Sequence, residues 1–347
     1  MTWFALEDDS EMLQQQIKGS DQREHSSKSD GRGYVVGVDI GGSRLRVGLA
    51  GMSGGILHQW SASTKEIRDP HEILQQIRCG VESILGEGGV SPNLIHGIGV
   101  GTPGVVDTKR GVVLATSYLM GWKDVAFRSM LREEFGVAAA IENDVNLAAI
   151  GERHAGSAQG SGDFVFLAVG TGIGAGIFID GRLHHGLDWK AGEVGYMLLP
   201  GTDVVPSKPH EPGAMEKVAG GAGLSSLWRD SWRSDVTSLP KDATVTDIFD
   251  QAVLGDSRAS ELLGLSSRTL AYTIMNLSIV LNCRLFVLGG TVGLHPAYAS
   301  AVRDVLDGLG SRGRLDLVPS ALGTEAQLIG AVILARQIAN GMDVDAL

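Results

Sequence analysis

The chain has few cysteines, few aromatic residues and no long apolar run. Cys79 and Cys283 are its only cysteines among 347 residues, and aromatic residues make up 5%. Two thiols this far apart indicate free, mostly buried cysteines in a reducing compartment. No apolar stretch reaches the roughly 20 residues that a membrane-spanning helix needs. We therefore expect a cytoplasmic protein without a membrane partner.

Basic residues are also in the minority, with 29 Lys and Arg against 40 Asp and Glu and a net charge of −11. This balance argues against a large nucleic-acid interface, which needs a basic face. The first ten residues carry no cationic segment, so we expect no secretory signal peptide. Residues 1–33 are polar and predict a flexible leader, too short and too poor in basic residues for a DNA-binding domain.

Glycine, by contrast, is abundant, with 49 residues gathered in short turns. The apolar content of 43% and the length predict a globular protein of about two domains with a sizeable core. Tyr34–Val38 predicts a strand, closed by Asp39 and a hairpin turn at Gly41-Gly42. A similar order recurs after a second predicted strand, Phe164–Val169, with the turn at Gly170–Gly176. This duplication predicts two matching units whose glycine turns hold one polyanion between them.

A predicted strand, Val137–Ile141, ends in Glu142, Asn143 and Asp144, and a helical pattern follows. Two interpretations compete here. Asn and Asp can cap a helix with a side-chain oxygen, which is the better interpretation of the pair alone. Alternatively, Asp144 is a catalytic base at the carboxyl end of a strand, where α/β sheets bind their ligands. The remaining motifs favour the second interpretation.

Three further segments allow both a structural and a functional interpretation. Gly101-Thr-Pro-Gly104 is either an ordinary tight turn or a place where a ligand approaches the backbone. Glu193, between Gly192 and Gly195, is either a solvated turn residue or part of a site. Glu216 is either a first-turn acid that faces the helix dipole or a ligand-binding residue.

Phosphoryl transfer fits this inventory, because it depends on positioning and charge stabilisation more than on covalent chemistry. Asp144 can accept the proton of an attacking hydroxyl, and Asp39 can help to hold hydrated Mg²⁺. Asn143, Glu193 and Glu216 can form hydrogen bonds with a polyhydroxyl acceptor.

Taken together, these motifs resemble the ROK family of sugar kinases and repressors, within the actin/hexokinase-like ATPase superfamily. The resemblance is to the glucokinase-like members and runs from about Gly33 to Ala339. Its motifs are Asp39-Ile-Gly-Gly-Ser43, Gly101-Thr-Pro-Gly104, Glu142-Asn-Asp-Val-Asn146, Gly170-Thr-Gly-Ile-Gly174, Gly192-Glu-Val-Gly195, Gly213-Ala-Met-Glu216 and Gly289-Gly290.

The resemblance implies two ribonuclease-H-like α/β domains with a cleft between them. Residues 34–142 and 323–347 would form the small N-terminal domain, and residues 143–322 the large C-terminal domain. The implied function is ATP-dependent phosphorylation of a hexose, with glucose to glucose 6-phosphate as the leading reaction. The alternatives are a non-catalytic sugar-sensing regulator, a kinase for another sugar such as N-acetylmannosamine, and polyphosphate as the donor. A homodimer would match the family's habit.

The resemblance also implies roles for individual residues. Asp144 would be the base, and Asn143, Glu193, Glu216 and Gly104 would bind the sugar. ATP with Mg²⁺ would be held near Asp39, Gly41, Gly42, Ser43, Arg44, Gly170, Thr171, Gly172, Gly289 and Gly290.

One departure from the family concerns its structural zinc site. Tyr196 stands at the position of a histidine ligand, and Ser207, Pro209 and Ala214 stand where the family has cysteines. Because a structural zinc needs about four nitrogen or sulfur ligands, we expect no such site here. The missing histidine is also a sugar contact in the family, so the identity of the sugar stays open.

Overall fold

The computed structural model describes residues 33–65, 67, 69–116, 119, 122–199, 211–310 and 315–342. The predicted leader therefore lies outside the described residues, apart from its last residue, Gly33. Ser207 and Pro209, two of the positions that bear on the zinc site, lie outside them as well.

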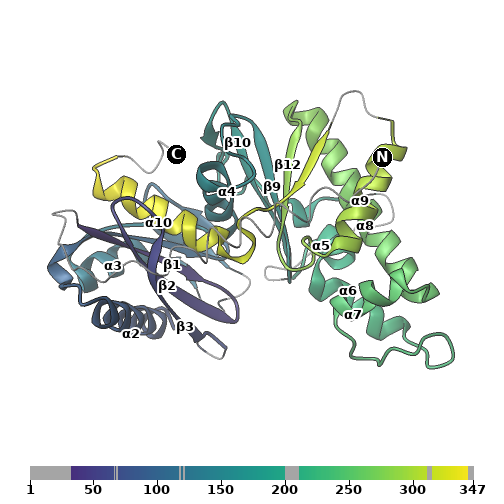
Figure 1. Cartoon of the computed structure of the whole chain (residues 1–347), viewed down its shortest axis with the longest axis horizontal. Coiled ribbons are helices and arrows are strands. Elements are labelled where there is room, and N and C mark those ends of the chain that lie inside the picture. The colour runs from purple at the N-terminus through teal and green to yellow at the C-terminus, as the bar shows by residue number, and fades with distance from the viewer. Residues whose placement is uncertain are drawn as a thin grey trace, which may run out of the picture. The chain divides into compact units, whose positions relative to one another are not determined.

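The first half of the chain builds a five-stranded sheet in the order β3-β2-β1-β4-β8 (Figure 1). The strands β1 (Tyr34–Ile40), β2 (Arg44–Gly51) and β3 (Ile56–Ser63) are antiparallel neighbours, and β4 (Ile95–Thr102) and β8 (Ala138–Asn143) continue in parallel with β1. From Val35 to Ile40 the residues of β1 are all buried, as expected for a central strand covered on both faces. The edge strand β3 alternates between partly buried and exposed residues.

The second half repeats this arrangement in a sheet of order β11-β10-β9-β12-β13. The strands β9 (Phe164–Val169), β10 (Ile173–Ile179) and β11 (Arg182–Leu183) are antiparallel neighbours, and β12 (Leu285–Gly289) and β13 (Asp316–Pro319) are parallel to β9. The two sheets are therefore the two matching units that the glycine turns predicted. The predicted fold class, a duplicated α/β architecture of the actin/hexokinase type, is confirmed by this topology and by related structures described below.

A smaller sheet and two helices complete the first half. The sheet joins β5 (Val105–Asp107), β6 (Val112–Ala115) and β7 (Lys123–Val125). The pair Asp69-Pro70 predicts a helix start, with Asp69 as the N-cap and Pro70 at the first helical position. Helix α2 (Pro70–Gly88) begins there, and Asp69 Oδ1 accepts the backbone N–H of His71 at 2.7 Å. The sequence of residues 123–135 predicts one helix, and this prediction is wrong at its start. Lys123–Val125 pairs with β6, and the helix α3 covers only Phe127–Phe135.

Helix α10 (Ala326–Ala339) packs against β1 and β4 and also against α4 (Asp144–Ala155), as the yellow helix in Figure 1 shows. The approach to α4 is close, because a Cβ atom at Gly330 would overlap the backbone carbonyl of Leu147. The end of the described chain is thus packed against the strands and the helix that carry the candidate site.

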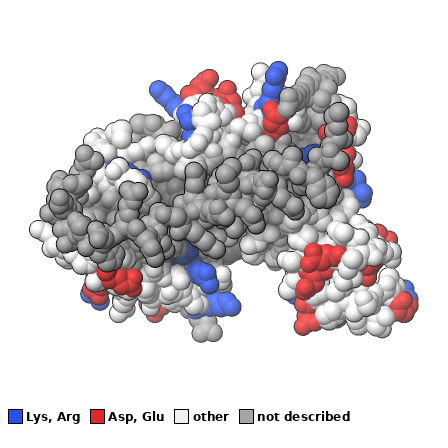
Figure 2. All heavy atoms as spheres, viewed as in Figure 1, with Lys and Arg blue, Asp and Glu red and all other residues white. Residues whose placement is uncertain are grey.

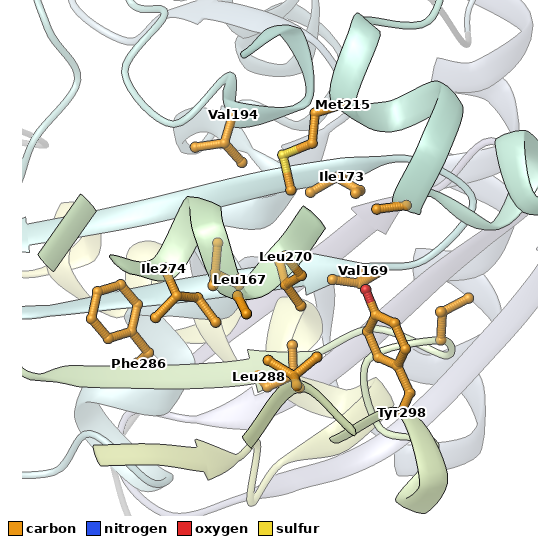
Figure 3. Close-up of a cluster of buried hydrophobic side chains, with 14 of the residues drawn as sticks. Leu167, Val169, Ile173, Val194, Met215, Leu270, Ile274, Phe286, Leu288 and Tyr298 are labelled. Atoms are coloured by element: carbon orange, nitrogen blue, oxygen red, sulfur yellow. The ribbon is translucent and has the colours of Figure 1, made fainter. Parts of the chain in front are cut away.

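The second half holds its own apolar core (Figure 3). Its β9 and β12 side chains, including Leu167 and Phe286, lie against Leu270 and Ile274 of α8 (Ser257–Leu281). The other helices here are α5 (Ala214–Ala219), α6 (Gly221–Ser231), α7 (Val245–Val253) and α9 (Pro296–Gly308), and the short 3-10 turns of the chain are η1 (Pro92–Leu94), η2 (Val194–Tyr196) and η3 (Gly323–Glu325).

Two smaller predictions need correction. The polar composition of the segment from Trp228 to Ala243 predicts a loop, but α6 continues to Ser231. Trp228 explains this, since its ring is fully buried and its Nε1 donates to the carbonyl of Pro240 at 3.1 Å. Both cysteines are free, as predicted. Cys283 is buried, but Cys79 is exposed on α2, so burial was predicted correctly for only one of them.

The surface of the second half is acidic around α6 and α7. Figure 2 shows red spheres gathered over that part of the molecule. The exposed acids of this region include Asp230, Asp235, Asp242, Asp247 and Asp250.

No helix among the described ranges is both long enough and apolar enough to cross a membrane.

Candidate active site

Three parallel strand ends bring the sequence motifs of the first half together. In the register of the sheet, Asp39 of β1 lies opposite Gly101 of β4, and Gly101 lies opposite Glu142 of β8. One residue further on, Thr102 lies opposite Asn143. The motifs that begin at Asp39, Gly101 and Glu142 therefore meet at one edge of the sheet, where parallel strands place their ligands.

Asn143 is the N-cap of α4. Its Oδ1 accepts the backbone N–H groups of Val145 at 2.9 Å and of Asn146 at 3.1 Å. Its Nδ2 donates to the carbonyl of Gly104 at 2.9 Å. Gly104 has a φ of 106°, a conformation that residues with a Cβ atom rarely adopt. The capping interpretation is thus correct for Asn143, whose side chain also joins the Gly101–Gly104 turn to the start of α4.

Asp144 is the first residue of α4 and directly follows the cap residue Asn143. Burial is the main cause that raises the pKa of Asp144 to about 7, and the negative charges of Asp39 and Glu193 act in the same direction. The hydrogen bond that Oδ1 accepts from the backbone N–H of Val145, at 3.0 Å, opposes this shift. A carboxylate with a pKa near neutrality is suited to taking up a proton during a reaction at physiological pH.

Glu193 and Glu216 come from the second half of the chain. Glu216 Oε2 accepts the backbone N–H of Ile173, the first residue of β10, at 3.1 Å. Burial raises the pKa of Glu216. Burial is also the main cause that raises the pKa of Glu193, and the negative charge of Glu216 adds to that shift. The charge of Glu193 also acts on Asp144, so the structure brings these two predicted site residues within electrostatic reach of each other.

Asp39 has a partner that the sequence analysis missed. Arg46, its register neighbour on β2, donates from Nε at 3.1 Å and from Nη2 at 2.8 Å, both to Asp39 Oδ2. Arg46 Nη1 also donates to Glu325 Oε1 at 3.0 Å. Burial still raises the pKa of Asp39, since desolvation outweighs the opposing attraction of the guanidinium. The hairpin spacing of seven residues was the signal that could have identified Arg46.

The glycine turns of the second half line a pocket of about 340 Å³. Of the predicted nucleotide-binding residues, Gly170 and Thr171 are part of its wall. Their backbone carbonyls accept the N–H groups of Gly221 at 2.8 Å and Ala222 at 3.0 Å, at the start of α6. The pocket's remaining lining, which the sequence analysis did not identify, consists of Ser225, Val245, Thr246, Phe249, Thr291, Val292 and His295, together with Gly221 and Ala222.

Some of the other predicted nucleotide-binding residues adjoin the pocket wall in the chain, and the rest belong to the turn between β1 and β2. Gly172 closes the Gly170 turn, because its carbonyl accepts the N–H of Gly170 at 3.0 Å. Gly289 and Gly290 directly precede Thr291 in the wall. The Gly41–Arg44 turn, which includes Gly42 and Ser43, lies instead between β1 and β2, next to Asp39 in the chain, and is not part of the pocket wall.

A larger hollow of about 860 Å³ lies between β3, α10 and the end of α4. Its lining contains none of the predicted site residues. Glu325, which receives the hydrogen bond from Arg46, is the nearest link to the strand ends. We therefore place the candidate site at the strand ends and the smaller pocket, despite the greater volume of this hollow.

Glu142 and His185 form a second pair that the sequence analysis missed. Glu142 is 1% exposed, and its Oε2 lies 2.7 Å from Nε2 of His185. Its Oε1 accepts the backbone N–H of Asn143 at 2.7 Å and Nδ2 of Asn146 at 2.9 Å. The position of Glu142, directly before Asn143, was a usable signal. His185 gave none, because its partner lies far away in the chain.

The zinc-site positions can be followed only in part. Tyr196 is exposed and its hydroxyl donates to the carbonyl of Glu211 at 3.3 Å, and Ala214 begins α5. Across the described ranges, no group of three or more His, Cys, Asp or Glu side chains is placed to hold a metal ion. The absence of a structural zinc site stays a prediction, since two of its positions lie outside those ranges.

Comparisons with known proteins agree with these motifs. A model of the ROK family matches residues 35–338. A glucokinase of Halalkalibacterium halodurans is 28% identical over 327 residues, which cover 89% of this chain and 97% of that protein. An N-acetylmannosamine kinase of Escherichia coli O1:K1 is 27% identical over 87% of this chain and 98% of its own length. A xylose repressor of Caldicellulosiruptor bescii is 32% identical, but over only 48% of this chain and 42% of the repressor.

A solved structure shows the same fold. The ROK family glucokinase of Streptomyces griseus, in complex with glucose and AMPPNP, aligns with a TM-score of 0.73 and 26% sequence identity. The alignment covers 88% of this chain and all of the other.

Proposed function

The chain belongs to the ROK family, and we propose that it is a sugar kinase that transfers the γ-phosphoryl group of ATP to a hexose, with glucose as the leading substrate. The observation that carries the proposal is the position and pKa of Asp144. This carboxylate stands at a strand end, next to Asn143 and within electrostatic reach of Glu193, and burial raises its pKa to about 7. The likeness to sugar kinases over nearly the whole chain supports the same assignment.

In the proposed reaction, Asp144 removes the proton from a sugar hydroxyl. The hydroxyl oxygen then bonds to the γ-phosphorus as the bond between that phosphorus and the bridging oxygen breaks, and ADP leaves. A general base of this kind contributes about 10²–10⁴-fold to a rate. The base needs a pKa near the working pH, which the surroundings of Asp144 provide.

The proposed sugar site uses Asn143, Gly104, Glu193 and Glu216. Since both polar ends of the Asn143 side chain already bond the backbone, we propose that Asn143 acts largely by holding the Gly104 turn. The two glutamates would accept hydrogen bonds from sugar hydroxyls. A neutral ligand rich in donors suits a group of carboxylates whose pKa values are raised.

The residues present also fit ATP and Mg²⁺. The pocket wall combines the apolar side chains Val245, Phe249 and Val292 with the Gly170–Thr171 turn, as a nucleoside and its phosphates require. Both hydrogen bonds to Asp39 go to Oδ2, which leaves Oδ1 as the candidate oxygen ligand of hydrated Mg²⁺. When bound, the ion neutralises charge on the phosphate oxygens. We keep Gly41–Arg44, Gly172, Gly289 and Gly290 as proposed nucleotide contacts.

A sugar-sensing regulator is the second candidate, and the partial likeness to a xylose repressor supports it. The presence of both Asp39 and Asp144 favours the kinase. We further propose the domain bounds 34–142 with 323–347 and 143–322, a homodimer and a cytoplasmic location.

A coupled ADP-release assay over a panel of sugars tests the proposal. The panel holds glucose, mannose, xylose and N-acetylmannosamine, each with ATP and with polyphosphate as donor. We expect ATP-dependent turnover that is fastest with glucose. If calorimetry shows tight binding of a sugar but no member of the panel is phosphorylated, the kinase proposal is rejected in favour of the sugar-sensing regulator.

A further inference from the structure

A hydrogen-bonded pair joins the end of β8 to the loop that follows β11. Glu142 is almost fully buried, and an ionised carboxylate only accepts hydrogen bonds, so His185 Nε2 donates to its Oε2 at 2.7 Å. The other oxygen takes the backbone N–H of Asn143 and Nδ2 of Asn146. A buried carboxylate held by three donors has one position, since breaking any of these bonds leaves charge unsatisfied away from water.

Backbone hydrogen bonds hold the loop from His185 to Gly192 at two points. The backbone carbonyl of His185 accepts the N–H of Ala191 at 3.1 Å, which closes the loop on itself. The carbonyl of Gly192 accepts the N–H of Ala175 on β10 at 2.8 Å. Gly192 has a φ of 90°, and a Cβ atom there would overlap the carbonyl of Ala175. Glu193 follows directly, and its backbone N–H donates to the carbonyl of Lys190 in the same loop at 3.3 Å.

The middle of this loop is strained. Trp189 has a φ of 60°, which is unusual for a bulky residue. Its ring meets the ring of His185 edge-on, with centroids 5.2 Å apart, and Nζ of Lys109 lies 5.8 Å from its centroid. Lys109 belongs to the turn between β5 and β6. The ring of Trp189 in this loop therefore contacts the ring of His185 and lies near Lys109 of the first half of the chain.

We infer that Glu142 and His185 are positioning residues that hold the Glu193 loop in register with Asn143 and Asp144, so that the sugar meets one preformed site. Neither residue needs to touch the sugar itself. The inference rests on the proposed kinase function and assigns roles to two residues for which the resemblance implied none.

The test is the variant His185→Phe, which retains a ring against Trp189 and removes the N–H donor. We expect the KM for the sugar to rise about tenfold, the loss expected from one charge-assisted hydrogen bond. The KM for ATP should change by less than about twofold, because the pocket at Gly170 does not depend on this loop. His185→Gln restores a donor and should recover most of the sugar KM. His184→Phe, the same change at the exposed neighbouring histidine, is the matched control and should leave both KM values unchanged.

A merely structural role would give a different pattern. It would lower the melting temperature and the active fraction, with the KM for the sugar unchanged, and that result would overturn the inference. So would a His185→Gln variant that behaves like His185→Phe. If His185→Phe does not fold, Glu142→Gln retains the shape and the Oε1 acceptor but removes the charge, and it should raise the same KM.

Calorimetric sugar binding separates this inference from the proposed function. If the wild type binds a sugar without turnover, the kinase proposal fails, and weaker sugar binding by His185→Phe would still support the positioning role. Unchanged binding by that variant would overturn it. A wild type that neither binds nor phosphorylates any sugar would contradict both.

Discussion

Replacing Asp144 with Asn should remove activity and, above neutral pH, stabilise the fold. The pKa of Asp144 is about 7 in the folded protein, against 3.8 for the free side chain. The unfolded chain therefore gives up this proton at lower pH than the folded protein does. As the pH rises through that window, the folded state loses stability relative to the unfolded state, and the loss is complete above pH 7.

The magnitude follows from the two pKa values. Each unit of pKa shift corresponds to about 1.4 kcal/mol of unfolding free energy. A shift of about three units therefore lowers the stability of the folded state by about 4 kcal/mol once Asp144 is fully deprotonated, and by less than half of that at pH 5. The amide that Asp144→Asn introduces carries no charge at any pH. The stability of the variant relative to the wild type should therefore grow by roughly 3 kcal/mol between pH 5 and pH 8.

Urea unfolding at pH 5 and at pH 8 measures this difference. The control is Asp235→Asn, since Asp235 is exposed and its hydrogen bond from Arg233 lowers its pKa, so that variant should gain no stability on raising the pH. In activity assays, kcat/KM of the wild type should fall about tenfold per pH unit well below pH 7, as the base becomes protonated. A constant stability difference between Asp144→Asn and wild type across this range would refute the assigned pKa and with it the argument for the base.

Three further variants test the architecture around the site. Asn143→Ala removes the cap of α4 and should destabilise the protein by about 1–2 kcal/mol in urea unfolding, while also raising the KM for the sugar. Arg46→Met leaves the buried carboxylate of Asp39 unpaired and should lower the unfolding free energy by about 3–5 kcal/mol, with a smaller loss in the double variant Arg46→Met, Asp39→Asn. Gly330→Val forces α10 away from Leu147 and should lower the melting temperature markedly, whereas an unchanged melting temperature would show that this contact is not close.

The sequence predicted the elements that have a local or periodic signal. The duplicated sheets followed from the repeated strand and glycine-turn order, and the start of α2 followed from the Asp69-Pro70 pair. Residues 123–125 were misassigned because their strand pairing with β6 depends on a partner elsewhere in the chain, which local helical propensity does not reveal. Trp228 extended α6 for the same kind of reason, since its burial depends on the surrounding core.

The residues of the candidate site also fall into those with a local sequence signal and those that depend on a distant partner. Asp144, Glu193 and Glu216 stood out because each lies beside a glycine turn or a strand end. In the structure the charge of Glu193 acts on Asp144, and the charge of Glu216 acts on Glu193. Asn143 turned out to serve as a cap, the structural alternative, and as a link to Gly104. Residues whose importance comes from a distant partner, such as His185 with Glu142, carry no local signal and needed the fold to be recognised.

The most direct measurement of the central claim follows the γ-phosphoryl group itself. Wild-type protein and Asp144→Ala are each mixed with γ-labelled ATP, Mg²⁺ and glucose, and the label on the sugar is counted after a single turnover. The account predicts labelled sugar phosphate from the wild type and none from Asp144→Ala, although the variant still binds glucose in calorimetry. Transfer by Asp144→Ala at a rate close to that of the wild type would contradict it.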